Sequence, residues 1–112
     1  MIWMELRSDG DVQIIMVLPR VDANNSKEME LQLQALMNGG AKKILCSFAA
    51  NEYVSSAGLR VFLAALKGMN KVGGRIVLCS LKPYVQEVFD MAGFSQLFSI
   101  YGSEAEAVEQ LR

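Results

Sequence analysis

Two adjacent serines in the segment Tyr53–Arg60 are the side chains best placed to do chemistry. They stand where a strand and a loop lead into a predicted helix, whose first four backbone amides lack helical partners and whose dipole is positive at that end. Ser55 or Ser56 could simply cap the helix by accepting a hydrogen bond from one of these amides. The alternative is phosphorylation. A phosphate on Ser56 would lie over free amides in a natural anion site, and its double charge would change the surface that a partner meets.

The absence of histidine excludes several kinds of catalytic and metal-binding site. The 112 residues include none, which excludes Ser-His-Asp and Cys-His catalysis, histidine phosphotransfer and histidine-ligated metal sites. Cys46 and Cys79 lie far apart, each in an apolar run, and two isolated thiols do not make a zinc site. We expect both to be small buried apolar side chains in a reducing compartment. The sequence therefore predicts a protein that is not an enzyme and uses no metal or cofactor.

Charge and hydropathy exclude two further classes of protein. Eleven basic and twelve acidic residues give a net charge of -1, without the basic excess of a nucleic-acid-binding protein. The longest unbroken apolar run, Val61–Leu66, is far too short to span a membrane. The N-terminal segment is charged and lacks the apolar region of a signal peptide. We expect a soluble, cytoplasmic protein with no direct nucleic-acid contact and no membrane insertion.

Alternating strands and helices must position the two serines. Apolar runs predict strands at Ile2–Leu6, Asp11–Leu18, Lys43–Phe48, Arg75–Cys79 and, as a small edge strand, Ser99–Tyr101. Amphipathic stripes bounded by caps and glycines predict helices at Asn25–Met37 and Ser56–Lys71. A third helix is predicted from Pro83 to a stop at Gly93, followed by a turn or helical piece at Phe94–Phe98. A last helix is predicted from a capping box at Ser103 to Leu111.

This order predicts one α/β domain spanning residues 1–112. Strands that alternate with helices pair in parallel through right-handed crossovers, whereas the turn composition of Ser8–Gly10 predicts an antiparallel N-terminal hairpin. The expected sheet is mixed and has four or five strands, with the amphipathic helices packed mainly on one side. Leu63 and Leu66 are expected to be buried against it, because they lie on the apolar stripe of their helix.

The positions of three further side chains bear on the function. Asp22, just before a helix, is by its position a loop or capping residue. Arg60 lies on the polar side of its helix and could pair with a partner's carboxylates or with a phosphate, although a solvated arginine is the default. Trp3, in the first predicted strand, could be a core residue or an exposed platform on an open sheet face.

Four segments resemble landmarks of the STAS family, the anti-sigma-factor antagonists of bacterial partner-switching systems. In chain order they are Arg20–Ala23, Tyr53–Val61, Lys71–Cys79 and Val88–Phe94. Arg20–Ala23 is similar to the family's loop between the second strand and the first helix, and Tyr53–Val61 is similar to its signature start of a helix. The resemblance covers nearly the whole chain and implies a single STAS-like domain.

The resemblance implies a switch that works through protein binding. An unphosphorylated antagonist binds an anti-sigma factor that is also a serine kinase, and the sigma factor is released. Phosphorylation of the antagonist on a serine then separates it from the anti-sigma factor. A metal-dependent serine phosphatase removes the phosphate and restores the binding form of the antagonist. The family's phosphorylated serine falls on Ser56, and Ser55, which stands where the family often has Asp, is the rival acceptor. The implied partner-binding residues are Asp22, Ser55, Ser56, Gly58 and Arg60.

Two other functions remain as alternatives. One is a non-phosphorylated STAS module held permanently in a larger complex, as in the lipid-transport ATPases of the family's other branch. The other is an α/β enzyme, for which the chain offers no acid–base pair, no histidine and no metal cluster. The expected oligomeric state is a monomer or a weak dimer.

Overall fold

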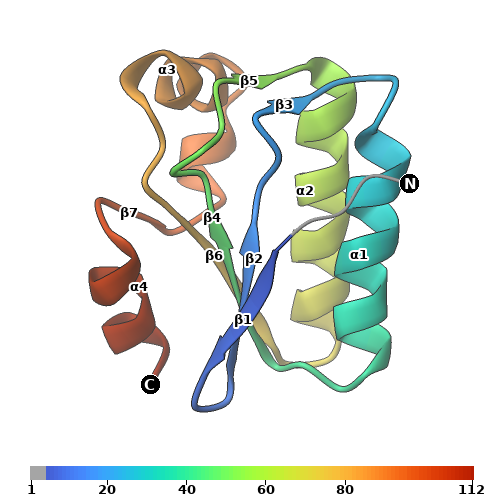
Figure 1. Cartoon of the computed structure of the whole chain (residues 1–112), viewed down its shortest axis with the longest axis vertical. Coiled ribbons are helices and arrows are strands. Elements are labelled where there is room, and N and C mark those ends of the chain that lie inside the picture. Colours follow the sequence, from blue (N-terminus) through green and yellow to red (C-terminus); the bar gives the residue numbers. More distant parts are fainter. Residues whose placement is uncertain (1–4) are drawn as a thin grey trace.

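A mixed sheet flanked by helices forms the body of the molecule (Figure 1). The computed structural model describes residues 5–112. Its strands are β1 (Leu6–Asp9), β2 (Val12–Met16), β3 (Arg20–Val21), β4 (Lys43–Ser47), β5 (Tyr53–Val54), β6 (Arg75–Cys79) and β7 (Ile100–Tyr101). Its helices are α1 (Ser26–Asn38), α2 (Ser56–Lys71), α3 (Pro83–Met91), the 3-10 helix η1 (Phe94–Gln96) and α4 (Glu104–Leu111).

The main sheet has five strands in the order β1-β2-β4-β6-β7. β1 pairs with β2 in antiparallel fashion, and the other neighbouring strands pair in parallel. The three apolar runs predicted as the centre of the sheet are β2, β4 and β6, and they lie next to one another. Parallel strands covered on both faces are expected to be apolar along their whole length. The predicted mixed α/β sheet is therefore confirmed.

The first strand that the structure describes lies further along the chain than the predicted strand Ile2–Leu6. The predicted strand Ile2–Leu6 falls mostly outside the described residues, as does Trp3. The first described strand is β1, and all four of its residues are exposed. It forms an edge of the sheet, where charged and polar side chains are common and hide the alternating pattern of a strand.

The hairpin turn shifts accordingly. Asp9 pairs with Val12, so the turn consists of Gly10 and Asp11 rather than Ser8–Gly10, and the predicted turn is wrong in its first two residues. Gly10 has a φ of 62°, a left-handed conformation that glycine adopts at little cost. The polar composition locates a turn here, but only the strand register fixes which residues form it.

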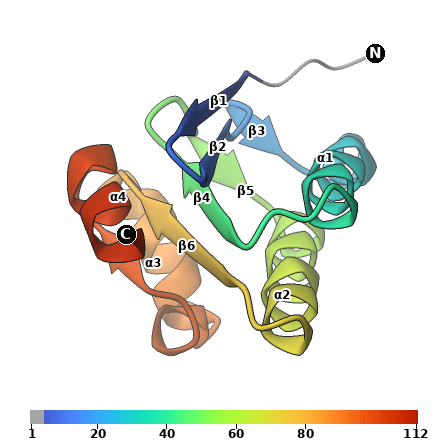
Figure 2. The ribbon, with the colours of Figure 1, turned by 90° about the horizontal axis from the view of Figure 1, so that it is seen from below.

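Different helices cover the two faces of the sheet. On one face, α1, α2 and α3 close over the main core, which includes Ile15, Phe48 and Phe62. On the other face, α4 packs its buried residues Ala107 and Val108 against a second cluster. Figure 2 shows α4 on the opposite side of the sheet from α1 and α2. The expected arrangement, with the helices mainly on one side, is confirmed.

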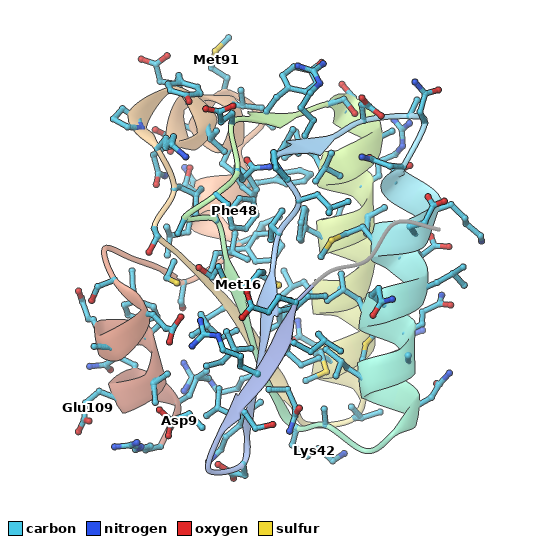
Figure 3. All side chains as sticks on the ribbon, in the orientation of Figure 1. Asp9, Met16, Lys42, Phe48, Met91 and Glu109 are labelled. Carbon is cyan, nitrogen blue, oxygen red and sulfur yellow. The ribbon has the colours of Figure 1, made fainter. Side chains whose placement is uncertain are left out.

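Three phenylalanines join the end of β4 to α2 and α3. The ring centroids of Phe48 and Phe62 are 5.2 Å apart, and those of Phe48 and Phe89 are 5.7 Å apart in an edge-to-face arrangement. All three side chains are fully buried, and Figure 3 shows Phe48 in the upper part of the molecule, below α3. Such aromatic pairs add to the free energy gained from burial alone, so this cluster anchors both helices at one end of the sheet.

The buried face of α2 is turned toward α1. Leu63 and Leu66 are only partly buried, and of these two only Leu66 packs against the main core. Val61 and Ala65 are buried instead, with 7% and 3% of their surface exposed. The predicted burial of these two leucines is wrong for Leu63 and only partly met by Leu66, because α1 packs along one flank of α2 and buries Val61 and Ala65 there.

The two cysteines lie on opposite faces of the sheet. Cys46 belongs to the main core and Cys79 to the cluster under α4, and neither side chain is exposed. Burial raises the pKa of both thiols above the usual value. The prediction of two buried, apolar cysteines is confirmed.

Candidate functional site

A short parallel ladder beside the main sheet supports the start of α2. β3 and β5 pair through Arg20 with Tyr53 and Val21 with Val54. The amide of Ser55 extends this ladder by donating to the Val21 carbonyl at 2.8 Å. Figure 1 shows both strands next to the first turn of α2. The sequence does not predict the ladder, because two-residue strands are too short to show a hydrophobic period.

Ser55 caps α2. Its backbone is extended, with φ −84° and ψ 174°, and its Oγ accepts a hydrogen bond from the Gly58 amide at 3.3 Å. Its carbonyl accepts a hydrogen bond from the Leu59 amide at 2.9 Å. This is the geometry of a helix N-cap, and the side chain is half-buried. The Ser55 hydroxyl is therefore engaged in holding the helix.

Ser56 has a different environment. It is the first residue of α2 and is exposed to solvent. The backbone amides of the first turn have few helical partners, and the helix dipole gives this end a partial positive charge. An anionic group on the Ser56 side chain would meet a favourable electrostatic environment there.

Gly58 lies beneath this surface. It is buried, and a Cβ atom at this position would stand 2.9 Å from side-chain carbons of both Val21 and Val54, and 3.2 Å from the Val21 carbonyl oxygen. Distances below 3.0 Å between such atoms are essentially never tolerated. Glycine lets α2 rest directly on the β3–β5 ladder, and its part in partner binding stays a prediction.

Asp22 organises the loop between β3 and α1. Its Oδ1 accepts a hydrogen bond from the Asn24 amide at 2.9 Å, and its carbonyl accepts one from the Ser26 amide at 2.8 Å. The Asn25 side chain completes the loop: it accepts from the Asp22 amide at 2.8 Å and donates to the Arg20 carbonyl at 2.7 Å. These contacts are those of a loop residue preceding a helix.

Arg20 and Tyr53 form a stacked pair that the sequence does not single out. The guanidinium carbon of Arg20 lies 4.4 Å from the ring centroid of Tyr53, and its Nε lies 3.9 Å from Oδ2 of Asp22. Arginine and tyrosine are both enriched at protein interfaces. Only the pairing of β3 with β5 brings these residues together, and that pairing leaves no signal in the sequence.

Arg60 lies one turn after Ser56 on α2, and residues four apart on a helix share a face. It is exposed, and no ion pair within residues 5–112 involves it. We call the region formed by the β3–β5 ladder and the first turns of α2 the Ser56 surface. Its side chains are Arg20, Tyr53, Ser56 and Arg60, together with Asp22, which follows β3 and contacts Arg20.

Three further observations concern residues 5–112 outside the Ser56 surface. Across residues 5–112, no three His, Cys, Asp or Glu side chains gather closely enough to hold a metal ion. None of the helices described there has the length and apolar character needed to cross a membrane. An open groove of about 490 Å³ lies at the C-terminal end of α1, lined by Gly39, Gly40 and Lys42 among others, and includes no residue of the Ser56 surface.

Comparisons of the sequence with a family model and with known proteins point to the same family. The STAS domain model matches residues 4–107. A candidate anti-sigma factor antagonist of Bordetella bronchiseptica, BtrV, is 38% identical over 87 residues, which are 78% of this chain and 75% of that protein.

Solved structures show the same fold. The crystal structure of a candidate anti-sigma factor antagonist from Thermotoga maritima matches with a TM-score of 0.92 at 24% identity, covering 97% of this chain and 94% of the other. SpoIIAA, a Bacillus cell fate determinant, in its phosphorylated form, matches with a TM-score of 0.76 at 20% identity, covering 98% and 100%. The chain therefore belongs to the STAS domain family, whose anti-sigma-factor antagonists are regulatory, non-enzymatic proteins.

Proposed function

We propose that the chain is an anti-sigma-factor antagonist that is switched off by phosphorylation of Ser56. Unphosphorylated, it binds an anti-sigma factor that is also a serine kinase, so that the sigma factor is released. Phosphorylation of Ser56 ends this complex, and a serine phosphatase restores the binding form. The chain acts in the cytoplasm, where sigma factors work, through binding alone and without a catalytic residue, metal or cofactor of its own.

The contrast between the two serines carries the proposal. A kinase must reach the hydroxyl that it phosphorylates. Ser56 is exposed at the first position of α2, whereas Ser55 is half-buried and its hydroxyl accepts a hydrogen bond from the Gly58 amide. Ser56 is therefore the favoured acceptor, and Ser55 is the residue that keeps its helix in place.

The phosphate acts mainly on binding rather than on the fold. The helix dipole and the free amides of the first turn favour an anion at Ser56 by about 0.3–1 kcal/mol. In a close-packed interface, the same dianion must lose its hydration and meets any acidic partner group as a like charge. It also faces Arg60 along α2, so it competes with partner carboxylates for this arginine.

The relatives support this role in general terms. BtrV, the relative from Bordetella bronchiseptica, is named as a candidate anti-sigma factor antagonist, and a protein of the same fold, SpoIIAA, has been solved in a phosphorylated form. The first fact supports the antagonist role, and the second is in keeping with a phosphorylation switch on this fold.

Binding of three variants to the anti-sigma kinase of the same organism tests the proposal. By calorimetry, Ser56→Asp is expected to bind about tenfold or more weakly than the wild type, because a buried like charge is costly. Ser56→Ala should bind normally and resist release by ATP. Ser8→Asp is the matched control, since it adds the same charge at an exposed serine of β1, and it should bind normally. Equal affinity of Ser56→Asp and wild type would contradict the proposal.

The alternative is a non-phosphorylated module of a stable complex, such as a lipid-transport ATPase. That function predicts no phosphate on either serine after incubation with the cognate kinase and ATP. It also predicts that the chain copurifies with membrane-transport subunits in the presence of ATP, whereas an antagonist is released from its kinase.

A further inference from the structure

The residue before α3 is unusual for its position. Lys82 is the N-cap of α3, since its carbonyl accepts hydrogen bonds from the amides of Val85 and Gln86. N-caps are normally Ser, Thr, Asp or Asn, and a lysine charge is unfavourable at the positive end of a helix dipole. The Lys82 side chain makes no capping hydrogen bond. A residue that departs from a local preference in this way points to a compensating contact elsewhere.

That contact is with the loop between β4 and β5. Nζ of Lys82 donates to the carbonyl oxygens of Ala49 and Asn51, each at 3.0 Å. Hydrogen bonds from a charged donor are roughly twice as strong as neutral ones. Within residues 5–112, no carboxylate forms an ion pair with Lys82, so backbone carbonyls hold this partly buried ammonium group.

Asn51 fastens the same loop from its other side. It is fully buried, and its Nδ2 donates to the Leu18 carbonyl at 2.7 Å and to the Tyr53 carbonyl at 3.2 Å. Its Oδ1 finds no hydrogen-bond partner in the described part of the chain, and a buried unpaired acceptor is costly. The loop is therefore held between the end of β2 and the start of α3.

This loop leads directly into the support of Ser56. The Glu52 amide donates to the Pro19 carbonyl at 2.7 Å, and the Ser55 amide donates to the Val21 carbonyl at 2.8 Å. β5 lies between these two bonds and forms the surface on which Gly58 rests. A displacement of the loop therefore moves β5 and the cap of α2 with it.

We propose that Lys82 is a positioning residue for the acceptor serine. By tying the start of α3 to the β4–β5 loop, it fixes the strand and the cap from which α2 presents Ser56. The role of Ser56 as acceptor rests on the proposed function, whereas the positioning is a property of the folded chain alone. The two can therefore fail independently.

Amide hydrogen exchange measures the positioning without any partner. In Lys82→Met, the amides of Glu52 and Ser55 should exchange about tenfold faster than in the wild type, because the loop loses two charge-assisted hydrogen bonds and opens locally. Amides in the middle of α1 should be unchanged. Lys82→Arg keeps a charged donor on a long side chain and should restore slow exchange at both amides.

Lys42→Met is the matched control. Nζ of Lys42 also donates to a backbone carbonyl, that of Val72, at 2.8 Å. Figure 3 shows Lys42 at the opposite end of the molecule from α3. This variant removes a comparable bond and should leave the exchange of Glu52 and Ser55 unchanged.

Phosphorylation by the cognate kinase gives the functional readout. Lys82→Met should raise KM for the antagonist about threefold with little change in kcat, because the loosened loop and cap must be ordered again when the kinase binds. Lys82→Arg should reverse the effect. Unchanged exchange at Glu52 and Ser55, or equal acceleration of all amides including those of α1, would overturn the inference. A wild type that is never phosphorylated would contradict the proposed function, and the exchange data would still decide the role of Lys82.

Discussion

At the residue scale, the neighbouring hydroxyl groups of Ser55 and Ser56 lie in different environments, one capping α2 and the other exposed to solvent. Loss of the Ser55 cap should destabilise the fold by about 0.5–2 kcal/mol in Ser55→Ala, because the Gly58 amide loses its acceptor. Ser56→Ala should stay within about 0.5 kcal/mol of wild type, as is usual for an exposed side chain. Urea unfolding of both variants checks this. A larger loss in Ser56→Ala than in Ser55→Ala would show that the cap has been assigned to the wrong serine.

Gly58 lets the first turn of α2 pack closely against the β3–β5 ladder. Gly58→Ala should cost about 1–3 kcal/mol, since the new methyl group would overlap the side chains of Val21 and Val54. Gly68→Ala, on the same helix, is the control. Its methyl group would meet mainly the flexible sulfur of Met37 at 3.3 Å, and alanine is the better helix former by about 1 kcal/mol. The free energies of unfolding of the two variants are compared with that of the wild type. Equal losses of stability would mean that α2 does not pack tightly against the β3–β5 ladder at Gly58.

Long elements are predictable from the sequence, whereas short pairings are not. α2 and β6 begin and end where their apolar patterns indicate, because burial of a repeating face dominates over many residues. β3 and β5 each contain two residues, and their pairing depends on how the chain folds rather than on local composition. The stacking of Arg20 on Tyr53 follows from that pairing, so it could not be predicted either.

The two serines illustrate the same limit within the site. Their position before α2 predicts that one of them caps the helix, but either side chain could do so. The choice depends on the backbone angles at Ser55 and on the amide of Gly58 that its hydroxyl meets. These are set by the contact of α2 with the β3–β5 ladder, which the sequence does not reveal.

Helix α2 also shows how neighbouring elements decide burial. Leu33 of α1 is 1% exposed within the main core, so Leu33→Ala should cost about 2–5 kcal/mol. Leu63 of α2 is only partly buried and lies outside that core cluster, so Leu63→Ala should cost about 1 kcal/mol or less. The same side chain is removed in both variants, and chemical denaturation compares them directly. A loss in Leu63→Ala as large as that in Leu33→Ala would mean that the apolar stripe is packed along its whole width.

The stability of the whole molecule should fall in acid and should hardly change around neutral pH. Without histidine, few groups titrate between about pH 6 and pH 8, so stability should be nearly flat there. A hydrogen bond from Lys43 lowers the pKa of Asp11, and hydrogen bonds from Ser95 and Gln86 lower the pKa of Asp90. A carboxyl group whose pKa is lower in the folded state stabilises the fold above its unfolded pKa. That contribution is lost as the pH falls through the folded value.

Urea unfolding at a series of pH values measures this dependence. The midpoint should be constant near neutrality and should fall below about pH 4, the unfolded range of aspartate. Asp90→Asn should show a smaller acid-dependent loss, because its amide cannot be protonated in this range. A midpoint that rises on acidification would contradict the direction of the two pKa shifts.

At the scale of the whole molecule, the Ser56 surface lies at one end of the sheet and rests on buried core residues, among them Val21 and Val54. Phe48, Phe62 and Phe89 anchor α2 and α3 beneath that end, while Ser56 stays exposed above them. We therefore expect the domain to stay folded when a charge is added at Ser56, because this side chain lies outside the core.

Mapping of the phosphate by mass spectrometry tests this account most directly. Wild type, Ser55→Ala and Ser56→Ala are incubated with the cognate anti-sigma kinase and ATP, and tandem spectra locate the modified residue. The account predicts a single phosphate on Ser56 in the wild type and in Ser55→Ala, and none in Ser56→Ala. A phosphate on Ser55 that persists in Ser56→Ala, or a wild type that takes up none, would contradict it.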